Sequence, residues 1–215
     1  MRLVASGVTF AYSRGDHQVL DGVEFDIPSG SAAAIIGPSG SGKTTLLSLM
    51  GRLLPMQAGS IQAIDAAGTE RPLAETATWV LQTVSLLPDR TALDNVAVGA
   101  YSDGASRADA RERAIESLAA VGLAGREHDP ARILSGGEAQ RVAIARALAS
   151  RRPIILADEP TGQLDARTSA TVLDAMVRAH GERTVVIVTH DPEVAQRCDI
   201  VLELRDGRIL ERSRP

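Results

Sequence analysis

A glycine-rich segment, GPSGSGKT, spans residues 37–44 and contains Lys43, the only lysine in a chain that has 22 arginines. Its three glycines permit unusual backbone angles and let the backbone approach a ligand closely. The apolar run Ala32–Ile36 precedes it and indicates a buried strand, and a helix is expected from Lys43 to near Gly51. Strand, G-x-x-x-x-G-K-[ST] loop and helix together predict a P-loop that binds nucleotide phosphates, rather than a glycine-rich turn with a solvated lysine.

The chemistry of such a loop assigns roles to its residues. Backbone N–H groups surround the phosphates, and the positive end of the following helix faces the same anion. Lys43 places a compact charge at the β- and γ-phosphates, where a planar guanidinium fits poorly. The Thr44 hydroxyl is expected to bind Mg²⁺. The residues predicted to contact the nucleotide in this segment are Gly37, Ser39, Gly40, Ser41, Gly42, Lys43, Thr44 and Thr45.

Composition limits the class of protein. With 215 residues and 44% hydrophobic content, the chain has enough apolar surface for one domain with an inserted subdomain. Its longest apolar runs are far below the roughly 18 residues of a membrane span, and we expect no signal peptide. Cys198 has no partner for an internal disulfide, which favours a reducing compartment and a buried thiol. A net charge of −4 argues against nucleic-acid binding.

Strand and helix signals alternate along the chain. Residues 3–12 and 19–27 have β-type alternation around a turn-like segment, Ser13–Asp16, and predict an antiparallel edge layer. From residue 83 to 133 the strand signal weakens. A helix is predicted over 107–121, with Ser106 and Asp109 as a capping box and Ile115, Leu118 and Ala119 on one face.

The remainder of the chain returns to an α/β pattern. We predict buried strands over 153–157 and 184–188, a helix over 167–179, a short helix opened by Asp191 and Pro192, and a final hairpin through Asp206-Gly207. The predicted fold class is α/β: a P-loop NTPase (RecA-like) core with an N-terminal antiparallel β layer and an inserted α-helical subdomain. The core comprises 1–82 and 148–215, and the subdomain comprises 83–147.

A second glycine-rich segment, LSGGEAQR, occupies residues 134–141. Ser135 and Glu138 predict a capping box ahead of a helix, so Gly136 and Gly137 would present bare N–H groups at a positive helix end. Such an end alone is more often only a cap. In a chain with a P-loop, it favours a nucleotide held between two helix ends.

Adjacent carboxylates follow the predicted strand in PIILADEPTGQLD, residues 153–165. Two acids at a strand tip repel one another unless a cation lies between them. We predict that Asp158 holds Mg²⁺ and that Glu159 orients and deprotonates an attacking water. The alternative is an acidic loop after a core strand, and the presence of the P-loop argues against it.

These three segments resemble the Walker A, signature and Walker B motifs of ATP-binding cassette (ABC) ATPases, the nucleotide-binding subunits of ABC transporters. The motifs have the family's order and spacing, LSGGE separates this family from other P-loop proteins, and the resemblance covers essentially the whole chain. SLLPDRTALDNV and DEPTGQLD, in a chain that ends soon after His190, resemble the lipoprotein-release and macrolide-export group. Cell-division and peptide-export ATPases share this short layout, and the ATPases of amino-acid importers are a further alternative.

The resemblance extends to single residues. Gln82 matches the Q-loop glutamine that reaches Mg²⁺ and the attacking water, and His190 matches the switch histidine at the γ-phosphate. Tyr12 resembles the aromatic that stacks on adenine, although it also suits an edge-strand core. Asp165 matches a loop aspartate that communicates between subunits, and Gln163 departs from the residues usual before Leu-Asp.

The resemblance also implies a mechanism and partners. Two copies would pack head to tail, so that each ATP lies between one P-loop and the Ser135, Gly136 and Gly137 of the other subunit. Lys43, Thr44 and Asp158 would hold phosphates and Mg²⁺, while Glu159, Gln82 and His190 organise the water. The second ATPase subunit would be an identical chain or a paralogue.

Separate transmembrane permease subunits would insert a short helix near Val84–Asn95, which places the chain on the cytoplasmic face of the cell membrane. The implied function is an ATPase that energises export or extraction. Two alternatives are a regulatory ABC ATPase that drives a signalling or cell-wall-hydrolase partner, and a soluble ABC protein that acts on ribosomes or in DNA repair. The charge balance argues against the last.

Overall fold

The computed structural model describes residues 1–13, 17–162, 164–178 and 183–213. The chain forms two compact units. The first consists of Met1–Ala77, Pro153–Asp158 and His180–Pro215, and the second of Thr78–Arg152 and Glu159–Ala179. The predicted subdomain, 83–147, lies within the second unit, which also takes in the segment after Asp158. Each unit is therefore built from separate stretches of the chain.

An antiparallel sheet forms one layer of the first unit. It contains β1 (Arg2–Phe10), β2 (Leu20–Ile27), β4 (Ala58–Ile64) and β5 (Glu70–Arg71) in the order β2-β1-β4-β5. Leu3 pairs with Ile27 and Val8 with Val23, and these side chains are buried on one face. The predicted antiparallel layer is thus confirmed. The turn predicted at 13–16 lies, apart from Ser13, outside the described residues.

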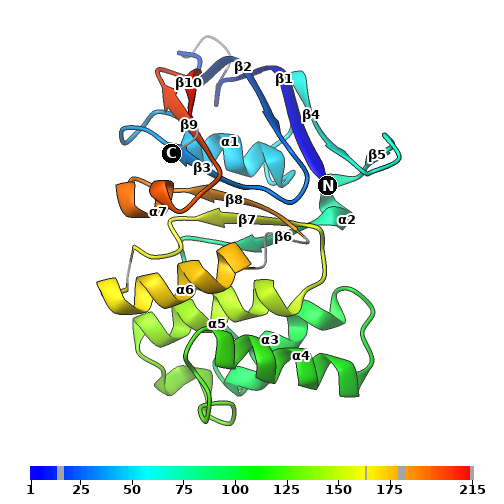
Figure 1. The fold of residues 1–215 in the computed structure, drawn as a ribbon, viewed down its shortest axis with the longest axis vertical. Coiled ribbons are helices and arrows are strands. Elements are labelled where there is room, and N and C mark those ends of the chain that lie inside the picture. Colours follow the sequence, from blue (N-terminus) through cyan, green and yellow to red (C-terminus); the bar gives the residue numbers. More distant parts are fainter. Residues whose placement is uncertain (14–16, 163, 179–182, 214–215) are drawn as a thin grey trace. The chain divides into compact units, whose positions relative to one another are not determined.

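A second sheet carries the P-loop. Within the first unit its strands have the order β10-β9-β3-β8-β7. The central strands β3 (Ala32–Ile36), β8 (Thr184–Val188) and β7 (Ile154–Asp158) are parallel and almost fully buried, as continuous apolar runs require. The last two strands, β9 (Ile200–Arg205) and β10 (Arg208–Ser213), form the predicted hairpin. Helix α1 (Lys43–Met50) lies between this sheet and the antiparallel layer (Figure 1).

Short elements complete the first unit and lead out of it. Helix α7 (Pro192–Gln196) begins after its N-cap Asp191, as predicted. Helix α2 (Leu73–Thr76) precedes β6 (Ala77–Val80), the strand at which the chain passes into the second unit.

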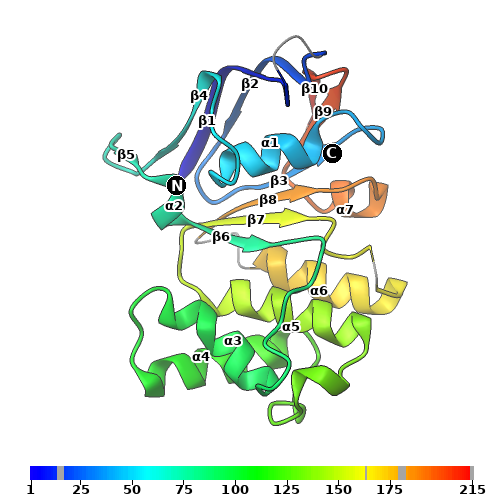
Figure 2. The ribbon, with the colours of Figure 1, turned by 180° about the vertical axis from the view of Figure 1, so that it is seen from behind.

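Four helices build the second unit (Figure 2): α3 (Ala92–Tyr101), α4 (Arg107–Ala120), α5 (Gly136–Ala149) and α6 (Ala166–Arg178), with a short 3-10 turn, η1 (Ala131–Ile133), before α5. Helix α5 packs against the other three. The sequence patterns predicted α4, α5 and α6, whereas α3 was not predicted.

Helix α4 departs from two expectations. Ser106 accepts the Asp109 N–H at 3.2 Å, but the Asp109 carboxylate accepts from Arg113 Nε at 2.8 Å, so the reciprocal half of the predicted capping box is wrong. The predicted apolar face is wrong at two of its three residues: Leu118 is buried as predicted, but Ile115 is 38% exposed and Ala119 is exposed. Successive helical residues differ by about 100° around the axis, and the helix turns its smaller side chains inward. The buried residues are Ala110, Ala114, Ser117 and Leu118.

Candidate nucleotide-binding site

The loop between β3 and α1 has a conformation that its glycines make possible. Gly40 and Gly42 have φ angles of 81° and 100°, in the left-handed region that disfavours other residues. A Cβ atom at Gly37 would lie 2.0 Å from the Leu204 carbonyl oxygen. Gly42 is the N-cap of α1 and supplies no side-chain acceptor to the first N–H groups. These donors suit an anion.

Side chains in the loop fit the same ligand. Lys43 Nζ donates to the carbonyl oxygens of Gly37 at 2.8 Å and Pro38 at 2.9 Å, which folds the lysine back along the loop. The Ser41 hydroxyl is buried, and no described residue offers it a hydrogen-bond partner. An unsatisfied buried hydroxyl among N–H donors and an ammonium group is a site that phosphate oxygens would complete.

Two predicted Mg²⁺ ligands meet at the end of β7. Thr44 Oγ1 donates to Asp158 Oδ1 at 3.4 Å, and Asp158 is 6% exposed. Hydroxyl and carboxylate oxygens are the hard donors that Mg²⁺ prefers, usually together with water and phosphate oxygens. These residues therefore fit the ion. The third predicted ligand, Gln82, is exposed and belongs to the second unit.

Tyr12 lies beside α1. Its hydroxyl is 3.0 Å from Thr45 Oγ1, and its ring meets Phe10 edge-on with centroids 5.2 Å apart. The side chain is 63% exposed. An exposed ring anchored next to the P-loop is suited to stacking on a base, and its exposure is greater than a core role would allow.

His190 also approaches the P-loop. It follows β8 by two residues and is exposed. Together with Gly37 and Pro38 it lines a depression of about 670 Å³, whose far wall includes Gln196, Glu203 and Arg205. The fold thus brings His190 to the first residues of the P-loop.

The second unit contains the other glycine-rich segment at the start of α5. The predicted capping box is confirmed: Ser135 Oγ accepts the Glu138 N–H at 3.3 Å, and Glu138 Oε2 accepts the Ser135 N–H at 2.9 Å. The backbone N–H of Ser135 is the main cause that lowers the pKa of the Glu138 carboxyl, with further help from the Ser135 hydroxyl and Arg126. Ser135 and Gly136 are exposed at this helix end.

The predicted catalytic glutamate also belongs to this unit. Glu159 has a φ of 46°, a left-handed angle that a non-glycine residue adopts at a cost of roughly 1–2 kcal/mol. Buried Gln140, on α5, donates to the Pro160 carbonyl oxygen at 3.2 Å and so fixes the segment that follows. Asp165 accepts from the Thr168 N–H at 3.0 Å and hydroxyl at 2.7 Å at the start of α6, and Gln163 lies outside the described residues.

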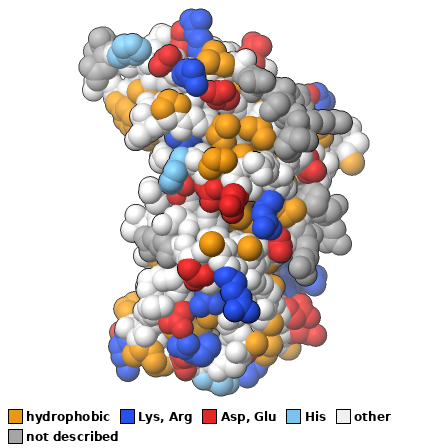
Figure 3. Space-filling model, turned by 60° about the vertical axis from the view of Figure 1, so that its left-hand side comes forward, with side chains coloured by type: hydrophobic (Ala, Val, Ile, Leu, Met, Phe, Trp, Pro, Cys, Tyr) orange, Lys and Arg blue, Asp and Glu red, His pale blue; other side chains and the backbone are white. Residues whose placement is uncertain are grey.

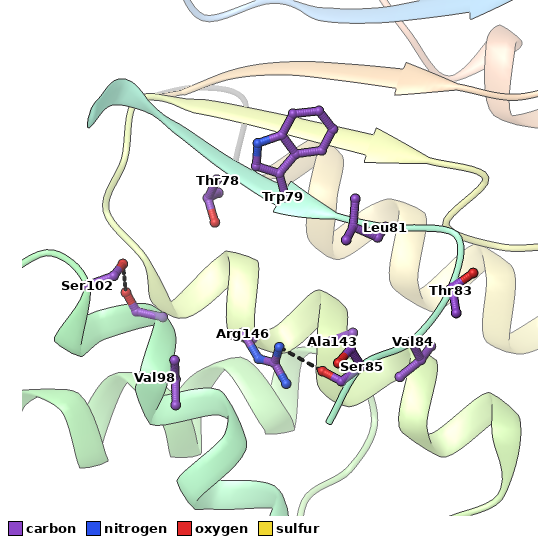
Figure 4. A pocket seen from close by; sticks show the side chains of 11 residues that line it. Thr78, Trp79, Leu81, Thr83, Val84, Ser85, Val98, Ser102, Ala143 and Arg146 are labelled. Carbon is purple, nitrogen blue, oxygen red and sulfur yellow. Dashed lines mark hydrogen bonds between the residues drawn. The ribbon is translucent and has the colours of Figure 1, made fainter. Parts of the chain in front are cut away.

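A pocket of about 260 Å³ lies between α3, α5 and the segment after β6 (Figure 4). Arg146 donates to the carbonyl oxygens of Ser85 and Asn95, both at 3.0 Å. Fully buried Asn95 in turn accepts the Leu87 N–H at 2.7 Å and donates to the Leu87 carbonyl at 3.0 Å. Sequence patterns gave no signal for Asn95 or Arg146, because Arg146 bonds residues that are far away in the sequence and Asn95 bonds the backbone of Leu87.

Neither sign of charge dominates the one face of the protein that is shown in Figure 3. Acidic and basic side chains are interspersed over the face shown in Figure 3. None of the helices in the described ranges has the length and hydrophobicity of a membrane span.

Comparison with known proteins agrees with this geometry. The family model for ABC transporters matches residues 20–162. The lipoprotein-releasing system ATP-binding protein LolD 1 of Caulobacter vibrioides is 44% identical over 95% of this chain and 93% of its own length. The macrolide export ATP-binding/permease protein MacB of Bradyrhizobium diazoefficiens is 41% identical over 99% of this chain, which spans about a third (34%) of that relative.

Solved structures give the same result. The dimeric structure of MJ0796, a bacterial ABC transporter cassette, matches with a TM-score of 0.85 and 34% identity, and covers 99% of this chain and 98% of the other. A post-hydrolysis state of the same cassette, bound to ADP and Pi, matches equally well. The fold is therefore that of a P-loop ATPase cassette, as predicted. The chain belongs to the ABC transporter family.

Proposed function

We propose that this chain is the ATP-binding and ATP-hydrolysing subunit of an ABC transporter that energises export or extraction through separate membrane subunits. The observation that carries the proposal is the P-loop. It combines N–H donors at α1 that have no side-chain cap, Lys43, and a buried Ser41 hydroxyl with no hydrogen-bond partner among the described residues, and Thr44 contacts Asp158. The close relatives named LolD and MacB support the export or extraction type.

Each group has a role in this proposal. Lys43 and the loop N–H groups bind the β- and γ-phosphates, and Tyr12 stacks on the base. Mg²⁺ held by Thr44 and Asp158 would neutralise phosphate charge. Glu159 accepts the proton of the attacking water, and Gln82 and His190 orient that water and the γ-phosphate. The remaining assigned contacts are those of Gly37, Ser39, Gly40, Ser41, Gly42 and Thr45.

A second subunit completes the site in this proposal. Ser135, Gly136 and Gly137 of one copy bind the γ-phosphate held by the P-loop of the other, and Asp165 lies at the contact between copies. The dimeric state of the MJ0796 cassette supports this arrangement. ATP then joins the two subunits, and hydrolysis releases them.

The membrane partner is a transmembrane permease subunit, and the chain acts on the cytoplasmic face of the membrane through it. The segment proposed to receive the partner's short helix, Val84–Asn95, overlaps the wall of the pocket in Figure 4 at Val84 and Ser85. A hydrolytic subunit can drive a distant permease only through such a contact.

Glu159→Gln tests the proposed chemistry. The variant should bind Mg-ATP as the wild type does, lose at least about 100-fold of the ATPase rate and accumulate as an ATP-dependent dimer, because the amide cannot accept the water proton. Calorimetry measures Mg-ATP binding, phosphate release measures the ATPase rate, and light scattering measures dimer formation. Glu112→Gln, at an exposed position of α4, serves as the matched control. Wild-type turnover by Glu159→Gln would refute the role of Glu159.

Capture of the Glu159→Gln chain with Mg-ATP from solubilised membranes tests the partner. A permease that copurifies only through an intact Val84–Asn95 segment supports the proposal, and vesicles of the complex should then move a substrate. Vesicles that hydrolyse ATP but move nothing would favour the regulatory alternative. Recovery of ribosomal or DNA-bound partners alone would contradict the transporter assignment.

A further inference from the structure

Arg126 makes two ionic contacts near the start of α5. It directly follows Leu-Ala-Gly (residues 123–125) in the loop between α4 and η1, outside every motif of the sequence. Its Nη1 donates to Glu138 Oε1 at 2.6 Å, and its Nε donates to Asp129. These two partners raise the pKa of the Arg126 guanidinium further above its usual value. One arginine therefore compensates two carboxylates.

The Glu138 carboxylate connects this arginine to the helix end. Oε1 is bound by Arg126, and Oε2 accepts both the Ser135 N–H and the Ser135 hydroxyl at 2.9 Å. The same hydroxyl accepts the Glu138 N–H at 3.3 Å. Ser135 Oγ thus donates its hydrogen to this carboxylate, and a phosphate oxygen that replaces the carboxylate as acceptor would lie near a full negative charge.

That charge conflicts with the proposed function of this helix end. A phosphate oxygen that accepts from Ser135 or the Gly136 N–H would come close to the Glu138 carboxylate, and like charges at this range repel. The Arg126 guanidinium binds Oε1, the carboxylate oxygen that Ser135 does not use, and so balances the charge without occupying the N–H groups of the helix end. Without it, Glu138 and Asp129 would both be uncompensated beside the incoming anion.

We propose that Arg126 is a positioning and charge-compensating residue for the nucleotide-facing end of α5: through Glu138 it fixes Ser135 and lowers the repulsion between this end and the γ-phosphate held by a second copy. The inference rests on the proposed function of Ser135. A loss of Arg126 should affect only one of two steps. Nucleotide binding to the P-loop of one chain does not involve α5, whereas ATP-dependent dimer formation does.

Variants in the Glu159→Gln chain test the proposal. Arg126→Gln should raise the Mg-ATP concentration for half-maximal dimer formation about tenfold, while the affinity of the monomer for Mg-ATP stays unchanged. Arg126→Lys should stay within about threefold of the parent, since it keeps the charge. Arg126→Gln combined with Glu138→Gln should also return to within about threefold. Arg111→Gln, which removes an exposed charge from α4, is the matched control and should have no effect.

Light scattering at each nucleotide concentration and calorimetry on dilute monomer give the two quantities, and thermal unfolding midpoints check the fold. A purely structural role for Arg126 predicts that the double variant is no better than Arg126→Gln, and this result would overturn the proposal. So would a parallel loss of monomer affinity, or a Lys variant as weak as the Gln variant. If Arg126→Gln does not fold, Arg126→Lys still tests the proposal. The proposal is wrong if this variant needs a much higher Mg-ATP concentration for dimer formation than the Glu159→Gln parent. A Glu159→Gln parent that never dimerises would instead overturn the proposed function itself.

Discussion

Cys198 shows how strongly a single residue's surroundings set its chemistry. The side chain is 3% exposed, and its Sγ donates to the Val194 carbonyl oxygen at 3.4 Å. Burial, followed by the charge of Asp199, raises the pKa of the Cys198 thiol to about 12. The buried free thiol expected from the sequence is present in the fold.

We predict that the native thiol is inert. With a pKa of about 12 the thiolate fraction at pH 8 is on the order of 10⁻⁴, against about one quarter for an unperturbed cysteine, and the thiolate is the reactive species. Reaction with a disulfide reagent at pH 8 should be at least about 100-fold slower in the native protein than in guanidinium. Rapid stoichiometric reaction of the folded chain would contradict this assignment.

Helix packing in the second unit depends on close backbone approach. Gly99 lies inside α3, and a Cβ atom there would lie 2.0 Å from the Arg146 carbonyl oxygen of α5. The contact brings α3 close to the arginine that holds Ser85. Glycine is unfavourable inside a helix by roughly 1 kcal/mol, so its presence here indicates a packing requirement.

Gly99→Ala should therefore destabilise the protein despite its better helix propensity. We expect a loss of about 1–3 kcal/mol in the free energy of unfolding, because the added methyl group forces the two helices apart. Gly162→Ala is the control: its Cβ would meet nothing closer than 3.7 Å, and its effect should be within about 0.5 kcal/mol. Urea denaturation followed by circular dichroism measures the free energy of unfolding of both variants. Equal midpoints would show that α3 can move away from α5 at little cost, which would contradict the prediction.

Elements were predictable where the signal is local. The P-loop, the α5 capping box and the buried runs of β3 and β8 depend on residues within a few positions of one another, and all were predicted. Helix α3 was not predicted, because Gly99 and the β-branched Val96 and Val98 weaken its helical pattern. The α4 face was wrong at Ile115 and Ala119, because burial depends on which helices pack against α4, and a single sequence does not show its neighbours.

At the scale of the whole molecule, the sequence predicted the residues of the candidate site, but it did not predict the residues that hold the surrounding segments in place. Thr44 and Asp158 are 114 positions apart, and motif order alone brought them together in the prediction. Asn95 and Arg146 are 51 positions apart and belong to no motif, so their contact required the fold. Arg126 was missed for the same reason, although it lies only 12 positions before Glu138.

Nucleotide binding should be visible in the stability of the complete chain. A ligand that binds only the folded state at 100 times its Kd adds about 2.7 kcal/mol to the free energy of unfolding. Mg-ATP should therefore raise the Tm of the wild type by several degrees. Lys43→Ala should lose most of this shift, and so should Lys43→Arg, because a guanidinium fits the loop poorly. Scanning fluorimetry measures the shift, and an undiminished response of both variants would contradict the role of Lys43.

The single lysine has a practical consequence for anyone who modifies this protein chemically. The ε-amino group of Lys43 and the α-amino group are the only primary amines of the chain, and Lys43 Nζ is held by two carbonyl groups of the P-loop. Amine-directed dyes, immobilisation resins and spacers will therefore attach at the amino terminus or at the nucleotide site, and nowhere else. In a dimer of this protein, amine-directed crosslinking is therefore limited to these two groups of each copy, whereas carboxylate-directed coupling will find reactive groups across its surface.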